Sequence, residues 1–326
     1  MELKRMKQPK WVLALIIAAG ALAASAEASA DSDPIRLSVN GTLVESGTTP
    51  IAVKGSVLVP LRTAAEALGA SIEWQSGSRT VVLSKWATRA ALTAGSDEAK
   101  IVRWTTLSEA VKLGTTPKLI DGRMYVPIRF LSDTFGYVVY YSSGTVYIRD
   151  PISPAQQETL ASGSLVEARK LVLTASRISR SDVEPLDGRA TGESFGTYRL
   201  FPEDEALRYL VLSEDCITYW EYQDGFMVAT WTARVGEAEV GIRNFLNGSW
   251  TEERGSKPDL EAQSYYYYLQ EYSMDTYTEA SGRLSSDGTM TSAAYNLDVG
   301  GSPVYQAEML YANSGEVRAE KIGVGR

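Results

Sequence analysis

The chain has 326 residues, with 32 lysines and arginines, 40 aspartates and glutamates, one cysteine and no histidine. The absence of histidine excludes serine–histidine–aspartate and cysteine–histidine catalysis, an imidazole general base and histidine-ligated metals. The formal net charge of −8 argues against nucleic acid and anionic lipid as partners. The single cysteine, Cys216, allows no intramolecular disulfide, and its place in an expected strand indicates a small buried residue and not a nucleophile.

The N-terminal segment up to Ala30 has the pattern of a secretory signal peptide. Basic side chains precede an apolar run at residues 11–24, and small residues follow up to Ala30. The run is shorter than the roughly 20 residues that a membrane-spanning helix needs, which disfavours an uncleaved anchor. We therefore expect cleavage after Ala30, with Ala28 as the second choice. The protein would be secreted or associated with the cell wall, without membrane insertion after cleavage.

A set of motifs then occurs twice. A Gly-Thr-Thr-Pro motif begins at residues 47 and 114, a Val-Pro-Leu/Ile-Arg motif begins at 59 and 126, and a glycine follows at 69 and 136. The differences 114 − 47, 126 − 59 and 136 − 69 all equal 67. A repeated supersecondary unit of this kind indicates two halves that complete one core.

Each copy predicts a hairpin, a helix and two closing strands, in that order. Lys-Gly or Asp-Gly turns between short apolar runs indicate the hairpins. Pro60 and Pro127 are expected to end a strand and open a helix, because a first helical residue needs no amide hydrogen, and Gly69 and Gly136 end the helices. The expected ranges are 51–53, 57–59, 61–68, 71–74 and 80–83 in the first copy, and 119–120, 124–126, 128–135, 137–141 and 145–148 in the second.

These paired elements resemble the stalk domain named after the N-terminal domain of copper amine oxidases. The Val-Pro-Leu/Ile-Arg step, the helix ending in glycine and the aromatic residue near the end of the next strand carry the resemblance, over about residues 35–150. It implies a small antiparallel sheet packed against helices, in a module of exported and cell-envelope proteins, mostly of Gram-positive bacteria. The resemblance does not extend to amine oxidation, which needs three histidine ligands and an Asn-Tyr-Asp/Glu motif, because the chain has neither.

Arg62 and Arg129 occupy the start of the two expected helices. One interpretation makes them a pair of ligand-binding cations. The other interpretation, which we favour, is that each arginine binds a neighbouring carboxylate or carbonyl and holds the start of its helix in place.

The second half of the chain begins with a linker at residues 151–157, where two prolines and a serine follow a strand. Residues 153–154 are also a good helix cap and first helical residue. The apolar spacing predicts that this helix continues to residue 175, with a break near residues 162–163. The polar residues 181–193 predict a loop.

The remainder predicts a meandering antiparallel sheet. Apolar and polar residues alternate over residues 207–211 and 227–235, which is the period of a strand. Turn signals separate the apolar runs, at residues 224–225, 247–248, 287–288, 300–301 and 314–315.

A second helix is predicted over residues 259–276, because Ser256 and Asp259 resemble a capping box with a proline in the first turn. It would contain the four consecutive tyrosines Tyr265 to Tyr268. These rings, with Trp220, Trp231 and Trp250, could stack on sugars of the cell wall; the alternative, which we favour, is that the helix packs its aromatic face on the sheet.

The predicted fold class is α+β. A two-repeat stalk domain of short antiparallel strands and two short helices is followed by an α+β domain with a meandering antiparallel sheet and one or two helices. The expected boundaries are 1–30 for the signal peptide, 31–150 for the stalk domain, 151–157 for the linker and 158–326 for a domain of unknown function.

The sequence provides no residue that we assign as catalytic, cofactor-binding or metal-binding, and no cofactor is expected. We expect an exported, non-catalytic cell-envelope protein whose stalk positions or docks a C-terminal interaction domain on a wall polymer or another envelope protein. The alternatives lie in residues 190–326: a wall hydrolase using paired carboxylates, such as those at 203–205 and 252–253, or a carbohydrate-binding module.

Overall fold

The structure is a computed structural model that describes residues 33–103, 107–189, 194–260 and 264–320. The predicted signal peptide therefore lies outside the described residues. The chain divides into two units at Ile35, and every element below belongs to the unit Ile35–Arg326. None of the helices in the described ranges has both the length and the apolar character needed to cross a bilayer.

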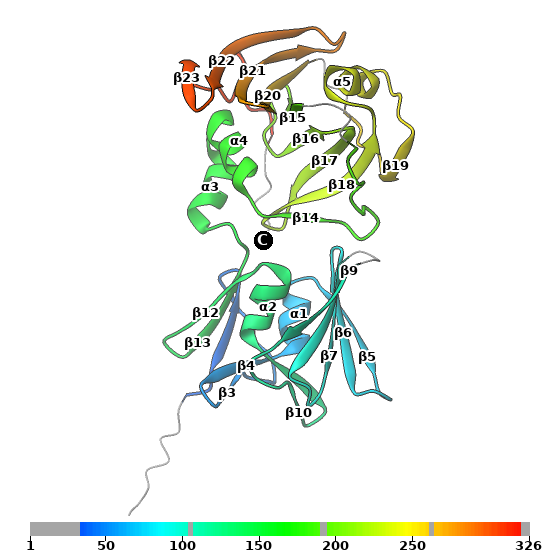
Figure 1. The fold of residues 1–326 in the computed structure, drawn as a ribbon. Coiled ribbons are helices and arrows are strands. Elements are labelled where there is room, and N and C mark those ends of the chain that lie inside the picture. The colour runs from blue at the N-terminus through cyan, green and yellow to red at the C-terminus, as the bar shows by residue number, and fades with distance from the viewer. Residues whose placement is uncertain (1–32, 104–106, 190–193, 261–263, 321–326) are drawn as a thin grey trace, which may run out of the picture. The chain divides into compact units, whose positions relative to one another are not determined.

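The two sequence copies meet in one four-stranded sheet with the order β10-β11-β4-β3 (Figure 1). Strands β4 and β11 run antiparallel, and Val59 lies opposite Val126, its equivalent in the other copy. Equivalent residues that face each other across an antiparallel pair are related by an approximate two-fold axis. The strands are β3 (Ile51–Val53), β4 (Ser56–Pro60), β10 (Lys118–Ile120) and β11 (Arg123–Pro127).

A short helix follows each hairpin, as predicted: α1 (Leu61–Ala67) in the first copy and α2 (Ile128–Phe135) in the second. Pro60 and Pro127 are the last strand residues and the N-cap residues of the helices, so they do not occupy the first helical position as expected. Gly136 has the left-handed conformation, with φ of 77°, that commonly ends a helix and that glycine adopts without steric cost.

Each copy then adds its closing strands to a separate sheet. In the first copy they belong to a five-stranded sheet of consecutive antiparallel strands, and in the second they join two N-terminal strands in the order β12-β13-β1-β2. Strands β7, β8 and β9 occupy the stretch between the copies and were not predicted from the sequence. The bounds are β5 (Ser71–Gln75), β6 (Thr80–Lys85), β7 (Thr88–Thr93), β8 (Glu98–Arg103), β9 (Leu107–Lys112), β12 (Val138–Ser142), β13 (Thr145–Arg149), β1 (Arg36–Val39) and β2 (Thr42–Leu43).

The helix predicted after the repeats is present with its break. It forms α3 (Pro154–Ser162) and α4 (Leu165–Thr174), and Gly163 lies between them. The side chains of Ser153 and Ser164 each accept a hydrogen bond from the backbone N–H of the third helical residue. The side chain of that third residue accepts a hydrogen bond from the backbone N–H of the serine, so both helices start with a capping box.

A ten-stranded mixed sheet makes up most of the C-terminal half, in the order β14-β18-β17-β16-β15-β20-β21-β22-β23, with β19 beside β18. Only the β14–β18 pair is parallel among the pairs described in this sheet. The strands are β14 (Arg177–Ser179), β15 (Ser194–Pro202), β16 (Arg208–Ser213), β17 (Cys216–Gln223), β18 (Phe226–Arg234), β19 (Glu252–Gly255), β20 (Ser264–Ser273), β21 (Thr276–Ser285), β22 (Met290–Val299) and β23 (Ser302–Tyr305).

The prediction of a helix over residues 259–276 is wrong, because the four consecutive tyrosines lie in strand β20. Tyr265 and Tyr267 belong to a core with α5 (Ala238–Leu246), a helix that was not predicted from the sequence. Tyr266 belongs to a core with α3 and α4. Successive side chains of a strand point to opposite faces, so a strand covered on both faces can bury four consecutive aromatic residues. The four tyrosines are at most 8% exposed, which removes them as a sugar-stacking platform.

A buried ion pair fixes the C-terminal segment 306–320, which has no helix or strand, to this half. Arg169 of α4 binds both carboxylate oxygens of Glu316 at 2.9 and 3.0 Å, and both side chains are fully buried. The guanidinium also donates to the carbonyls of Pro202, Glu205 and Tyr311. All its charge-assisted bonds are therefore made inside the protein, where losing one partner is costly.

We predict that Glu316→Gln lowers the free energy of unfolding by about 3–5 kcal/mol, because it leaves the Arg169 cation buried without a counter-charge. Burial raises the pKa of Glu316, but the hydrogen bonds and charge of Arg169 outweigh it and hold that pKa below its usual value. A lowered folded pKa stabilises the protein above the unfolded pKa of about 4.3 and ceases to do so as pH falls through the folded pKa. The difference between wild type and variant should therefore shrink in acid.

Urea unfolding between pH 3 and pH 7 measures this effect. Glu308→Gln, at an exposed position of the same segment, is the control and should change stability by no more than about 0.5 kcal/mol. Equal effects of the two substitutions would contradict the role of the buried pair.

Candidate functional site

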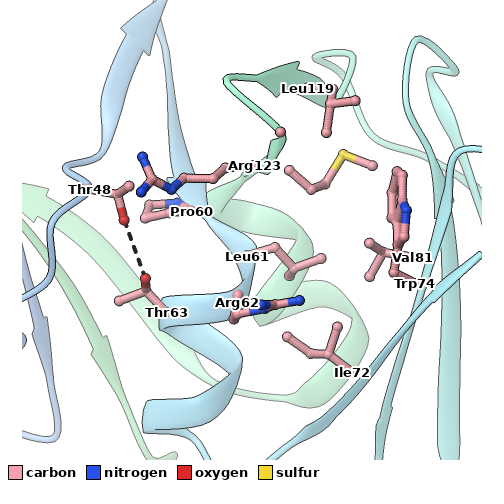
Figure 2. Close-up of a pocket in the computed structure, with 12 residues that line it drawn as sticks. Thr48, Pro60, Leu61, Arg62, Thr63, Ile72, Trp74, Val81, Leu119 and Arg123 are labelled. Carbon is pink, nitrogen blue, oxygen red and sulfur yellow. Dashed lines mark hydrogen bonds between the residues drawn. The ribbon is translucent and has the colours of Figure 1, made fainter. Parts of the chain in front are cut away.

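A cavity of about 250 Å³ lies in the first copy, between α1, the edge of the five-stranded sheet and the β10–β11 hairpin. We call it the seam cavity. Its apolar lining comes from elements far apart in sequence, because the second copy closes over the first. Figure 2 shows these side chains converging, among them Leu61, Ile72, Val81 and Leu119. Met124 also lines the cavity.

Trp74 forms one wall of the seam cavity. It lies on β5 opposite Val81 of β6, on the same face of the strand as Ile72. The indole remains 40% exposed, whereas most large apolar side chains of this half belong to the core cluster around Leu61 and Leu131. A large aromatic ring that is held by the fold and still open to solvent is typical of ligand-contacting positions.

Two arginines flank the apolar lining. Arg62 extends from α1, and Arg123 lies beside Thr48 and Pro60 (Figure 2). Both residues are exposed, and neither side chain has a hydrogen bond or ion pair with any residue that the structure describes. A guanidinium without a protein partner is available for an anionic ligand.

We expected Arg62 and Arg129 each to bind a neighbouring carboxylate or carbonyl. The described part of the chain shows no such bond for Arg62. Arg129 is likewise exposed and without such a bond there. The structure brings Arg62 to the seam cavity but places Arg129 in the other copy, so the two do not form a joint site. The partner of Arg62 at this site is Arg123, which the sequence analysis did not single out.

The equivalent positions around the second copy carry different side chains. The offset between the copies makes Ser56 the equivalent of Arg123, and the Ser56 hydroxyl lies 2.7 Å from the hydroxyl of Thr115. By the same offset, Tyr141 takes the place of Trp74. The second copy therefore has one arginine where the first has two, although its scaffold is the same.

The carboxylates of the hydrolase alternative make structural contacts. Glu203 binds Arg283 at 2.9 Å and accepts a hydrogen bond from Ser264, and Glu253 accepts the indole N–H of Trp250 at 2.8 Å. Asp204, Glu205 and Glu252 likewise accept bonds from described residues, respectively Val317, Arg208 and Arg254. These carboxylates are therefore engaged in holding loops and strands together.

The other reactive side chains are also held by the fold. Cys216 is buried, as predicted, and burial together with its hydrogen bond to Asp215 raises the pKa of the thiol to about 12, which keeps it protonated at neutral pH. Burial lowers the pKa of the Lys85 amine, against the effect of Asp224 at 3.8 Å. The amine donates to the carbonyl of Leu68 at the end of α1, where a cation is favourable.

Comparison with known proteins identifies the part of the chain that carries the seam cavity. Residues 38–148 match the model of the copper amine oxidase N-terminal domain. This segment is a copper amine oxidase N-terminal domain. The resemblance inferred from the repeated motif is thus confirmed, and the seam cavity is a feature of this domain in the present chain.

The chain is also similar to a protein from Brevibacillus choshinensis that is named "Protease inhibitor". The two are 27% identical over 152 residues, which is 45% of this chain and 45% of the relative. The match thus spans less than half the length of either protein.

We predict that Arg62→Ala changes the free energy of unfolding by no more than about 0.5 kcal/mol, because the side chain makes no bond within the described structure. Leu61→Ala, one residue earlier and 1% exposed, should cost about 2–5 kcal/mol through the loss of core packing. Urea unfolding of both variants checks this. If Arg62→Ala cost more than about 1 kcal/mol, the arginine would hold the helix in place after all.

Proposed function

We propose that this chain is an exported, non-catalytic cell-envelope protein. In this proposal the copper amine oxidase N-terminal domain docks on an envelope partner through the seam cavity, and the C-terminal half is the interaction domain that it positions. The signal-peptide pattern that ends at Ala30 supports export.

The seam cavity is the observation that carries the proposal. Its lining combines an apolar floor, the exposed Trp74 ring and the free guanidiniums of Arg62 and Arg123. No aspartate, glutamate, lysine, cysteine or tyrosine is among the residues described at its wall. These side chains can bind and orient a ligand. The hydroxyls of Thr48 and Thr63 also line the cavity, 3.5 Å apart, but none of the residues described at its wall is a general base that would activate them.

The remaining observations favour binding over the alternatives. The carboxylates considered for a hydrolase are engaged in structural bonds, as described above. The tyrosines considered for sugar stacking are buried. The relative that matches 45% of this chain is named "Protease inhibitor", and this name supports a non-catalytic role with a protein partner.

Sedimentation with isolated cell envelopes of the source organism tests the proposal. We predict that the mature chain, residues 31–326, co-sediments with the envelopes. Retention should fall by about tenfold in Trp74→Ala and in the Arg62→Ala/Arg123→Ala double variant, because these changes remove the ring and both cations.

The two-fold symmetry of the domain provides matched controls. Tyr141→Ala and Arg129→Ala alter the equivalent positions of the second copy and should leave retention unchanged. If the seam-cavity variants bound the envelopes as well as wild type, or if the controls lost retention equally, the seam cavity would not be the docking site.

A further inference from the structure

We propose that the ligand of the seam cavity is an extended segment of a partner protein, which pairs with the free edge of β5. The segment places an apolar side chain in the cavity and carboxylates at the cavity-facing positions before and after it, against the exposed guanidiniums of Arg62 and Arg123 that flank the apolar lining. This inference rests on the proposed docking function and specifies its ligand.

A free strand edge borders the seam cavity. Strand β5 is the terminal strand of its sheet and pairs only with β6 in the described structure, so its other side has no strand partner. Such an edge presents unpaired N–H and C=O groups that an extended peptide can pair with. Strand β10, on the opposite side of the cavity, is also a terminal strand, but it has only three residues against five in β5.

The side chains of β5 are arranged for this mode of binding. Ile72 and Trp74 line the cavity, so the alternation of a strand directs Glu73 to the other face of the sheet. A peptide added to this edge alternates in the same way. Every second side chain of the peptide would therefore point into the cavity, and the residues between them would point away.

The charges select the chemistry of the segment. The chain as a whole has a net charge of −8, yet the two residues with formal charge at the cavity wall are both arginines. Guanidinium groups bind carboxylates with two parallel hydrogen bonds. Carboxylates at the cavity-facing positions on either side of a cavity-facing apolar residue would give each arginine one partner and place the apolar side chain against the apolar lining.

The apolar lining favours a peptide over a wall polysaccharide. Leu61, Ile72, Val81, Leu119 and Met124 offer no hydrogen bond to sugar hydroxyls, whose burial without partners is costly. An aliphatic side chain gains free energy in the same place. The experiment below must therefore distinguish binding of a peptide from binding of an anionic wall polysaccharide.

Around the second copy, one of the two arginines that flank the cavity of the first copy has no equivalent. Strand β12 is also terminal in its sheet, but the position of Arg123 is taken by Ser56, which is already hydrogen-bonded to Thr115. An acidic segment would find one arginine there in place of two. The structure therefore assigns the site to the first copy only.

Selection from a displayed library of random peptides of about eight residues, long enough to cover a strand, tests the ligand class on the mature chain. We expect the selected peptides to contain Asp or Glu two positions from Leu, Ile, Val or Phe. Their affinity should fall by about tenfold or more for Arg62→Ala/Arg123→Ala and remain unchanged for Arg129→Ala. Selection of peptides without a carboxylate, or equal binding to the double variant, would overturn the proposal.

N-methylation of a selected peptide tests the strand pairing. Backbone N–H groups of a strand point alternately to its two sides, so methylating one alternate set should abolish binding and methylating the other set should preserve it. An equal effect of both sets would contradict pairing with β5.

Purified wall polysaccharide separates failure of this inference from failure of the docking function. If envelope retention depends on the seam cavity but is competed by the polysaccharide and by no selected peptide, the docking site stands and the peptide ligand is wrong. If retention does not depend on the seam cavity at all, the proposed function itself fails.

Discussion

The antiparallel pairing of β4 with β11 is the interaction on which the N-terminal half depends. It joins the two copies at equivalent residues, Val59 and Val126, and both are fully buried. Neither hairpin has enough apolar surface to be stable alone, since an isolated two-stranded hairpin is marginal in water. The pairing also delivers Leu119 and Met124 of the second copy to the wall of a cavity whose helix and edge strand belong to the first. The candidate site is thus a direct consequence of how the repeats join.

The two flanks of the domain differ through small departures from this symmetry. The scaffold keeps its hairpins and helices at a constant offset, while Arg123 replaces the serine of the first copy and Trp74 stands where the second copy has Tyr141. Two copies of the same scaffold can in this way differ, so that one copy has the candidate site and the other lacks it. In the other half, the buried pair of Arg169 and Glu316 fastens the C-terminal segment without contributing to this cavity.

The sequence predicted the elements whose signals are local. Prolines and glycines determine the local backbone conformation directly. The helices that they were predicted to begin, end or interrupt, including the break at Gly163, are found in the structure. The tyrosine run was misassigned because four adjacent aromatic residues fit either a helix or a strand buried on both faces, and only the cores beside β20 decide between them. The seam cavity was missed for the same reason: Arg62 and Arg123 are brought together by the pairing of distant hairpins. A position-by-position comparison of the two copies would have revealed Arg123 in place of Ser56, and this difference could have indicated the seam cavity.

Native-state hydrogen exchange of the mature chain tests the central claim, that the copies form one cooperative unit through the β4–β11 pair. We predict that the amides of β4 and of β11 that donate hydrogen bonds to the other strand exchange with the same free energy of opening, within about 0.5 kcal/mol. If the amides of one hairpin opened several kcal/mol more easily than those of the other, the copies would be independent and the cavity between them could not be a stable site.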